Sequence, residues 1–251
     1  MRLTNPSLQH CIWMEEIGSA FIYIPKTACT SWKLFLWQLN GNTISSEISY
    51  SNVHNENTIK LPYVYKMNRS RQEEFVNELN KGKISVCSVV REPYSRVLSG
   101  YLDKILMHKN PDSSFSKLII PEIKRYHDLE DSTAPTFLQF LQWNHEKKGK
   151  ELLNDHWRPA TELLGLHENN DYLDNENVKL WPMTKMNEAA DWFKTRFKAN
   201  IDFPSSQELG TRKTNTSEEQ IDRYFGDQEK VVFESIYKQD LSLYQSIMAH
   251  Q

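Results

Sequence analysis

Two segments of the chain read as a short apolar strand, a polar turn and the start of a helix. In the first, residues 21–24 form an apolar run that Pro25 ends, and Lys26 opens the turn. In the second, the apolar run 84–90 leads to Arg91, and Pro93 suits the first turn of a helix. Strands that alternate with helices predict an α/β fold with a parallel sheet. We therefore expect a P-loop-like, three-layer fold in which helices flank a central parallel sheet.

Apolar spacing and turn residues predict the other elements. A further strand is expected over 178–182, and helices are expected over 31–39, 71–79, 93–105, 135–143, 187–197, 217–224 and 229–247. Thr30 or Ser31 is expected to cap the first of these helices, and Gly41 is expected to end it. Residues 109–133 are mixed and mostly polar, and the pattern predicts no element there.

Length and composition bound the classes of protein to which the chain can belong. With 251 residues, we expect one domain with a nucleotide-binding core at about 20–107 and an acceptor-site and C-terminal helical region at about 108–251. The net charge of −3 argues against a nucleic-acid partner. No apolar run reaches about 18 residues and the N-terminus lacks a signal-peptide pattern, so we expect no transmembrane segment and a cytoplasmic location. The pattern does not indicate an oligomeric state.

The three cysteines, Cys11, Cys29 and Cys87, show neither disulfide nor metal-ligand spacing. Reduced thiols and no metal site follow from this, with Cys87 expected to be a small buried residue of a strand.

The turn after the first strand has the residues of a phosphate loop, although it lacks the glycines of a Walker A sequence. A helix that starts there offers backbone N–H groups to an anion, and Lys26 would lie across that site. The loop residues are Thr27, Ala28, Cys29, Thr30 and Ser31. An ordinary strand–helix turn with a surface lysine explains the same spacing, so this alternative stays open.

The second segment offers a second anion site. Arg91 ends the strand and Ser99 follows eight positions later, and a guanidinium and a hydroxyl suit one phosphate. Arg96 either adds charge or belongs to a solvated helix face. Because ligands of open α/β folds bind at the carboxyl ends of the strands, the two sites suit a nucleotide with phosphates at both ends.

These motifs resemble those of a known family. Residues 25–33 are similar to the 5′-phosphosulfate loop of Golgi carbohydrate sulfotransferases, especially the chondroitin and dermatan 4-O-sulfotransferase group of sulfotransferase family 2. Residues 90–101 resemble that family's 3′-phosphate motif. Residues 154–159 resemble its His-Trp segment, and 203–241 its C-terminal region.

The resemblance implies a sulfotransferase that uses PAPS (3′-phosphoadenosine 5′-phosphosulfate) and releases PAP. It implies that the loop through Trp32 holds the 5′ end of the donor and that Arg91, Ser99, Arg212 and Lys213 hold its 3′-phosphate. Trp32 has an alternative place in the core, which its helical spacing favours.

Sulfuryl transfer requires neutralisation of the leaving phosphate and removal of a proton from the acceptor hydroxyl. The resemblance gives the first task to Lys26, with no metal. His54 or His156 is the expected base, since histidine has a suitable pKa. Glu56 is a further candidate for this role.

The acceptor is expected to be a glycan or glycoconjugate hydroxyl, recognised by segments such as 42–62 and 109–133. We expect no membrane anchor of the family's usual kind in this chain, and residues 163–170 lack the family's cysteine pair, which puts the usual acceptors in question. Two other functions stay open. One is a P-loop-like nucleotide kinase or phosphotransferase, which the missing Walker A sequence disfavours, and the other is a non-catalytic PAP(S)-binding module.

Overall fold

The computed structural model describes residues 5–43, 48, 52–55, 57–148, 153–166, 176–204 and 220–250. The chain divides into two compact units. Unit 1 contains residues 1–91, 160–212 and 243–251, and unit 2 contains residues 92–159 and 213–242. The expected single domain, with a nucleotide-binding core at about 20–107, stays a prediction.

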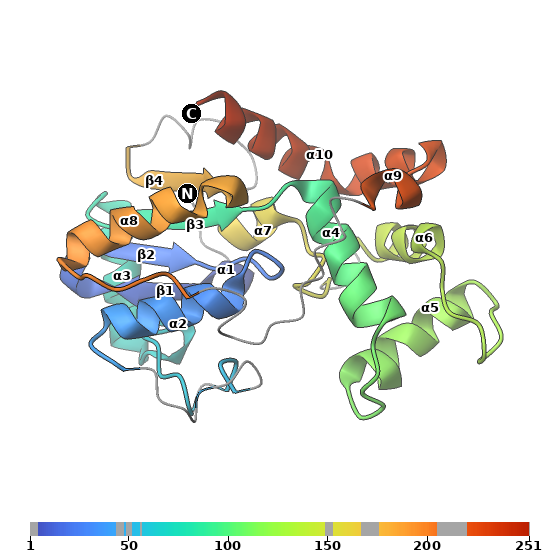
Figure 1. Ribbon diagram of the computed structural model, residues 1–251, viewed down its shortest axis with the longest axis horizontal. Helices are drawn as coiled ribbons and strands as arrows, with labels where there is room; N and C mark the ends of the chain where they lie inside the picture. The colour runs from blue at the N-terminus through green and yellow to red at the C-terminus, as the bar shows by residue number, and fades with distance from the viewer. Residues whose placement is uncertain are drawn as a thin grey trace. The chain divides into compact units, whose positions relative to one another are not determined.

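Unit 1 is built on a four-stranded, mostly parallel sheet of order β1-β2-β3-β4. Its strands are β1 (Cys11–Met14), β2 (Ser19–Ile22), β3 (Ser85–Val90) and β4 (Val178–Pro182). The arrows of β2, β3 and β4 point the same way in Figure 1, because these strands pair in parallel. The fold is therefore α/β, with β4 where the sequence predicts it.

The sheet departs from the expected parallel arrangement at one edge. β1, which the sequence pattern did not predict, pairs antiparallel with β2 and sets Cys11 opposite Ile22. Only the short 3-10 turn η1 (Glu15–Ile17) and Gly18 join the two strands. A connection of this length permits a hairpin but not the crossover that a parallel pair needs.

One face of the sheet packs against α2 (Cys29–Leu39) and α8 (Met186–Phe197). Alternate strand residues, among them Phe21 and Cys87, point to this face and enter a cluster with Trp32 of α2. This follows the two-residue period of strand side chains.

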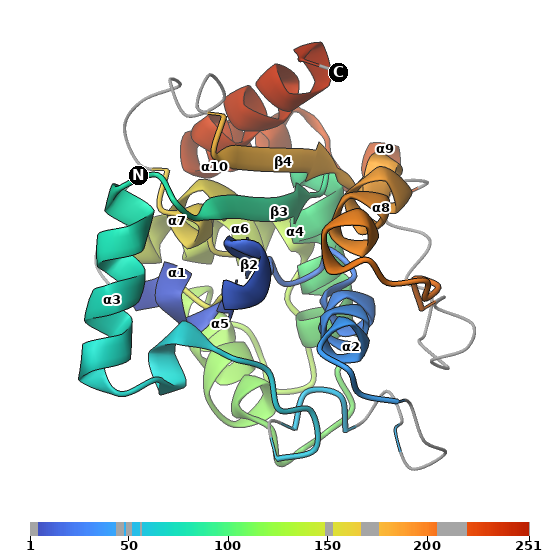
Figure 2. The ribbon, with the colours of Figure 1, turned by 90° about the vertical axis from the view of Figure 1, so that its left-hand side faces the viewer.

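The other face packs against α3 (Arg69–Asn80) and α7 (Ala160–Leu164), with Ala20 and Ile22 of β2 pointing toward them. Figure 2 shows α2 and α8 on one side of the sheet and α3 and α7 on the other. Within unit 1, the predicted arrangement of helices on both faces of a central sheet is confirmed.

Unit 2 is helical and has a core rich in aromatic side chains, including Tyr101, Phe140 and Phe233. Its elements are α4 (Pro93–Tyr101), the π-helical η3 (Leu102–Leu106) and η4 (Phe115–Ile119), α5 (Ile120–Tyr126), α6 (Phe137–Lys147), α9 (Ile221–Tyr224) and most of α10 (Asp227–Ala249). The backbone of α10 leaves helical geometry at Tyr237, with φ −112° and ψ 17°. The predicted long terminal helix is therefore present but kinked.

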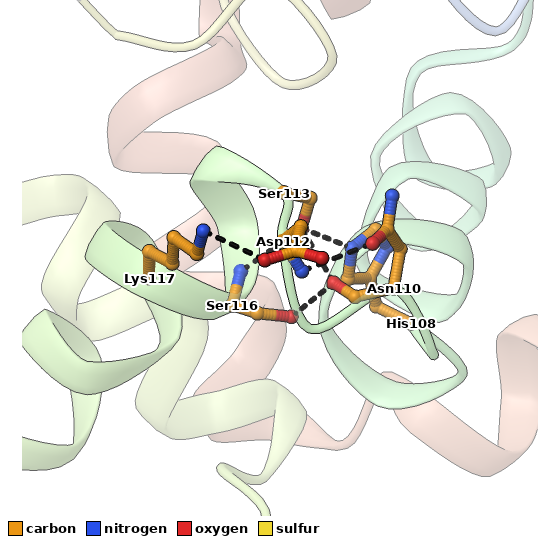
Figure 3. Close-up of polar contacts among 6 residues, drawn as sticks. All are labelled: His108, Asn110, Asp112, Ser113, Ser116 and Lys117. Atoms are coloured by element: carbon orange, nitrogen blue, oxygen red, sulfur yellow. Dashed lines mark hydrogen bonds and ion pairs between the residues drawn. The ribbon is translucent and has the colours of Figure 1, made fainter.

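The polar segment 109–133, where no element was predicted, contains η4 and α5. The loop before η4 is held by its own polar groups (Figure 3). The carbonyl of Asn110 accepts hydrogen bonds from the hydroxyls of Ser113 and Ser116, at 3.0 and 2.8 Å. Lys117 and Asp112 form an ion pair at 2.8 Å. Local side-chain bonds of this kind give the backbone an alternative to the bonding of a regular helix or strand.

The remaining short elements are α1 (Asn5–Gln9), η2 (Val64–Lys66) and η6 (Met183–Lys185). The first predicted helix, α2, begins two residues earlier than expected, at Cys29. The expected cap is wrong, because Ala28 occupies the N-cap position and no side chain caps the helix. Residues 217–219 of the predicted helix 217–224 lie outside the described residues. None of the helices in the described ranges combines the length and the apolar character that spanning a membrane requires.

Candidate functional site

The loop after β2 is held in an unusual backbone conformation. Lys26 and Ala28 have φ angles of 72° and 57°, in the left-handed region that residues other than glycine seldom adopt. Each such residue costs about 1–3 kcal/mol, a strain that is typically kept at functional sites. Thr27 fastens the loop from within, since its N–H and its hydroxyl both donate to the carbonyl of Ile24, at 3.2 and 2.6 Å. Thr27, a predicted donor-binding residue, therefore already uses both of its hydrogen-bond donors within the loop.

Helix α2 starts directly from this loop. Its first backbone bond runs from the N–H of Trp32 to the carbonyl of Ala28, at 3.1 Å. The preceding N–H groups, those of Cys29, Thr30 and Ser31, have no helical carbonyl behind them. They lie at the positive end of the helix dipole, where anions are stabilised.

Arg91 comes from the neighbouring strand to the same loop. Because β2 and β3 are parallel, their carboxyl ends meet at one edge, and Ser88 extends the contact by donating to the carbonyl of Ile22 at 2.6 Å. Nη1 of Arg91 then donates to the carbonyl of Lys26 at 3.2 Å. The structure thus brings the guanidinium of Arg91 to the backbone of Lys26, so that residues of the two predicted phosphate motifs meet.

His54 also reaches this loop. It lies on the surface of unit 1, and its Nε2 forms a hydrogen bond with Oγ1 of Thr30 at 3.0 Å. This contact spans 24 residues of sequence and was not predicted. It couples an imidazole to the first turn of α2, while the predicted role of His54 as a base stays a prediction.

Trp32 lies in the core, as its helical spacing favoured. Its indole is 1% exposed and stacks on Phe21 with ring centroids 4.7 Å apart. The side chain is therefore not available to adenine, and only its position in the motif links it to the donor.

The three cysteines carry free thiols. Cys11 and Cys87 are buried, and burial raises the pKa of both thiols. Cys29, the first residue of α2, is half-buried.

Lys33 is a cation of the same region that the sequence reasoning did not single out. It is only 5% exposed, and its ammonium lies 4.2 Å from the ring centroid of Tyr23. A lysine within the otherwise apolar stripe of α2 was the signal available in the sequence. Its charge is compensated in part by this cation–π contact.

Two predicted site residues, Ser99 and His156, are among the described residues of unit 2. Ser99 is buried within α4. His156 is half-buried in the segment 153–159, between α6 and α7.

Both roles expected for Arg96 are wrong. It is neither a solvated face residue nor a surface charge, since it and Asp240 are each 1% exposed. Their closest side-chain atoms, Nη2 and Oδ2, are 3.7 Å apart, and the guanidinium also donates to the carbonyl of Arg158. A buried charge of this kind is tolerated when an opposite charge and hydrogen bonds accompany it.

Three predicted residues, Arg212, Lys213 and Glu56, lie outside the described residues. Within the described ranges, no group of three histidine, cysteine, aspartate or glutamate side chains could hold a metal ion.

Sequence comparison with known proteins identifies the family of this chain. The sequence model of the sulfotransferase family matches residues 9–245. Carbohydrate sulfotransferase 12 of Xenopus laevis is 21% identical over 183 residues, which cover 64% of this chain and 43% of that protein. Carbohydrate sulfotransferase 11 of Rattus norvegicus is 27% identical over 176 residues, covering 64% of this chain and 47% of the relative. Human carbohydrate sulfotransferase 14 is 26% identical over 163 residues, which cover 62% of this chain and 39% of that protein.

The matches to these relatives span less than half of their length. No solved structure gave a significant match. The family match itself covers almost the whole chain, including the loop at Lys26, the strand that ends at Arg91 and the segment around His156. The chain therefore belongs to the sulfotransferase family.

Proposed function

We propose that this chain is a PAPS-dependent sulfotransferase that moves a sulfuryl group to a hydroxyl of an acceptor, and that the acceptor is a carbohydrate. The observation that carries the proposal is the contact between Arg91 and the carbonyl of Lys26, at the start of α2. It joins two cationic motifs at the carboxyl edge of parallel strands, where α/β folds bind nucleotides.

The loop geometry supports a P-loop-like role. Successive N–H groups around left-handed residues form the concave anion sites known as nests. Lys26 and Ala28 supply such residues without glycine. A helix start, a lysine and an arginine are then available for the phosphate groups of the donor, with Thr30 adding a hydroxyl. Ser99, Arg212 and Lys213 complete the proposed donor-binding set.

The proposed reaction is an in-line displacement at sulfur. The acceptor oxygen forms a bond to sulfur while the bond from sulfur to the phosphate oxygen of PAPS breaks, and PAP and a sulfate ester are the products. Charge develops on the leaving phosphate, and Lys26 neutralises it. A base, His54 or His156, takes the proton of the acceptor hydroxyl. These are the demands of a loose transition state, for which positioning and electrostatics supply most of the catalysis.

The carbohydrate acceptor is inferred from the relatives, which are named carbohydrate sulfotransferases. The matched segments leave more than half of each relative unmatched. The sugar and the position sulfated are therefore left to experiment.

The test is sulfuryl transfer from radiolabelled PAPS to a panel of desulfated glycans, oligosaccharides and small hydroxyl compounds. Lys26→Ala should lower kcat by about 10²–10³-fold, the usual cost of removing a group that stabilises developing charge. Arg91→Ala should mainly raise the Kd for PAP. Lys230→Ala, which removes an exposed lysine of α10, is the matched control and should behave as wild type.

Wild-type activity in Lys26→Ala would contradict the mechanism. Binding of PAP without transfer to any acceptor would instead indicate a binding module. Hydrolysis of ATP with Mg²⁺, without binding of PAP, would indicate a phosphotransferase.

A further inference from the structure

The His156 imidazole is fixed by the side chain two residues before it. Nδ1 of His156 lies 2.8 Å from Oδ1 of Asn154, and the backbone N–H of His156 donates to the same oxygen at 3.1 Å. The ring of Phe115 packs against the imidazole edge to face, with centroids 5.5 Å apart. The ring is thus held both by a hydrogen bond and by an aromatic contact.

The two contacts of Asn154 Oδ1, one with the backbone N–H of His156 and one with its Nδ1, decide which ring nitrogen carries the proton. A backbone N–H can only donate, so the atom of Asn154 that it meets must be the amide oxygen. That oxygen can only accept, so Nδ1 of His156 must be the donor. In the neutral imidazole the lone pair is then on Nε2. The geometry therefore specifies the tautomer that can accept a proton at the outer end of the ring.

The backbone around His156 is fastened as well. The carbonyl of Asn154 accepts from the N–H groups of Trp157 and Arg158, at 3.0 and 2.8 Å. The hydroxyl of Tyr237 donates to the carbonyl of Trp157 at 2.5 Å, and Arg96 donates to the carbonyl of Arg158.

Helix α4 packs closely against the backbone of the segment that carries His156. A Cβ at Gly100 would lie 2.9 Å from the carbonyl oxygen of His156, so this position needs a residue without a side chain. Together with the polar contacts, this close approach leaves the segment little freedom to reorient the imidazole.

We infer that Asn154 is a positioning residue, which holds His156 as the Nδ1–H tautomer so that Nε2 serves as the base for the acceptor hydroxyl. The proton moves from the acceptor oxygen to Nε2 as the bond from that oxygen to sulfur forms. The tautomer follows from unit 2 alone, whereas the base role rests on the proposed function. In this assignment His54 is not the base, and its hydrogen bond to Thr30 orders the start of α2.

The tautomer can be tested without any assay of activity. Protein labelled with ¹⁵N-histidine is examined by long-range ¹H–¹⁵N NMR at a pH where imidazole is neutral, and His156→Gln assigns the signals. Wild type should show His156 protonated on Nδ1. Asn154→Ala should move a large part of that proton to Nε2, whereas Asn154→Asp keeps an acceptor oxygen and should retain the Nδ1–H form. A wild-type Nε2–H form, or no change in Asn154→Ala, would overturn the inference.

Turnover then tests the base role. Removing a general base typically costs about 10²–10⁴-fold, so Asn154→Ala and His156→Gln should each lower kcat strongly and leave the Kd for PAP near wild type. The double variant should be no slower than His156→Gln alone, because the two residues act as a unit. Asn154→Asp should restore much of the rate and shift the acidic limb of the pH profile, where the rate rises as the base loses its proton, to higher pH, since a carboxylate favours the imidazolium. Asn77→Ala, on the exposed side of α3, is the control.

Losses that multiply in the double variant, or a normal kcat in Asn154→Ala, would refute the positioning role. Failure of every acceptor assay would overturn the base role together with the proposed function. The NMR result would still decide the tautomer, so the two failures are distinguishable.

Discussion

Tyr237→Phe removes one buried hydroxyl that joins three parts of unit 2. The hydroxyl donates to the carbonyl of Trp157 at 2.5 Å and accepts from Nδ2 of Asn144 at 2.8 Å. Tyr237 is fully buried at the kink of α10, and Asn144 is fully buried in α6. Phenylalanine keeps the ring in the core but leaves a carbonyl and an amide N–H without this partner.

The expected cost follows from those two groups. A buried polar group left unsatisfied costs about 1–3 kcal/mol, so two such groups predict a loss of about 2–6 kcal/mol of unfolding free energy. For a chain of this size each kcal/mol lowers Tm by about 2–4 °C, which predicts a fall of about 4–24 °C. The segment that carries His156 should loosen at the same time, because the lost bond holds the carbonyl of Trp157.

Urea unfolding followed by circular dichroism measures the free energy, and the m-value shows whether the cooperative unit has changed. Tyr126→Phe, at an exposed tyrosine of α5, is the control and should change stability by less than about 0.5 kcal/mol. In Asn144→Leu/Tyr237→Phe the loss should be smaller than the sum of the single losses, because both partners become apolar. A loss below about 0.5 kcal/mol in Tyr237→Phe would refute the role assigned to this hydroxyl.

Two further predictions concern the reactivity of the cysteines and the close contact at Gly100. In the native protein, iodoacetamide should modify Cys29 and spare Cys11 and Cys87, because burial raises the pKa of those two thiols and hides them. PAP should protect Cys29, as mass spectrometry of tryptic peptides would show, and modification that PAP does not slow would place the donor elsewhere. Gly100→Ala should lose about 1–3 kcal/mol in the same urea assay, since its Cβ would lie 2.9 Å from the carbonyl oxygen of His156. Wild-type stability in this variant would show that α4 and the His156 segment can separate at no cost.

The elements with strong periodicity were predictable from the sequence. The apolar run 84–90 and the strand 178–182 appear as β3 and β4, and the helices flank the sheet as expected. The strand β1 was missed because it has four residues and depends on its hairpin partner β2 rather than on its own pattern. The predicted helix 93–105 appears as α4 followed by the π-helical η3, whereas η4 lies in the polar segment where no element was predicted.

The sequence predicted that Arg91 follows a strand, but it did not predict the contacts of the candidate residues. Arg91 directly follows β3, Lys26 lies beyond the end of β2 at Ile22, and the parallel pairing of the two strands brings these segments together. The left-handed conformations of Lys26 and Ala28 could not be predicted, because that region normally signals glycine. The bond between His54 and Thr30 depends on tertiary structure, which local propensity does not encode.

The most direct test of the central claim is equilibrium binding of PAP, followed by thermal unfolding and calorimetry. At a hundredfold excess over its Kd, PAP should stabilise the native protein by about 2.7 kcal/mol. ADP, which lacks the 3′-phosphate, should have a weaker effect at the same concentration, and Arg91→Ala should lose most of the response to PAP. A response to ATP with Mg²⁺, without a response to PAP, would contradict the assignment of a PAPS-dependent sulfotransferase.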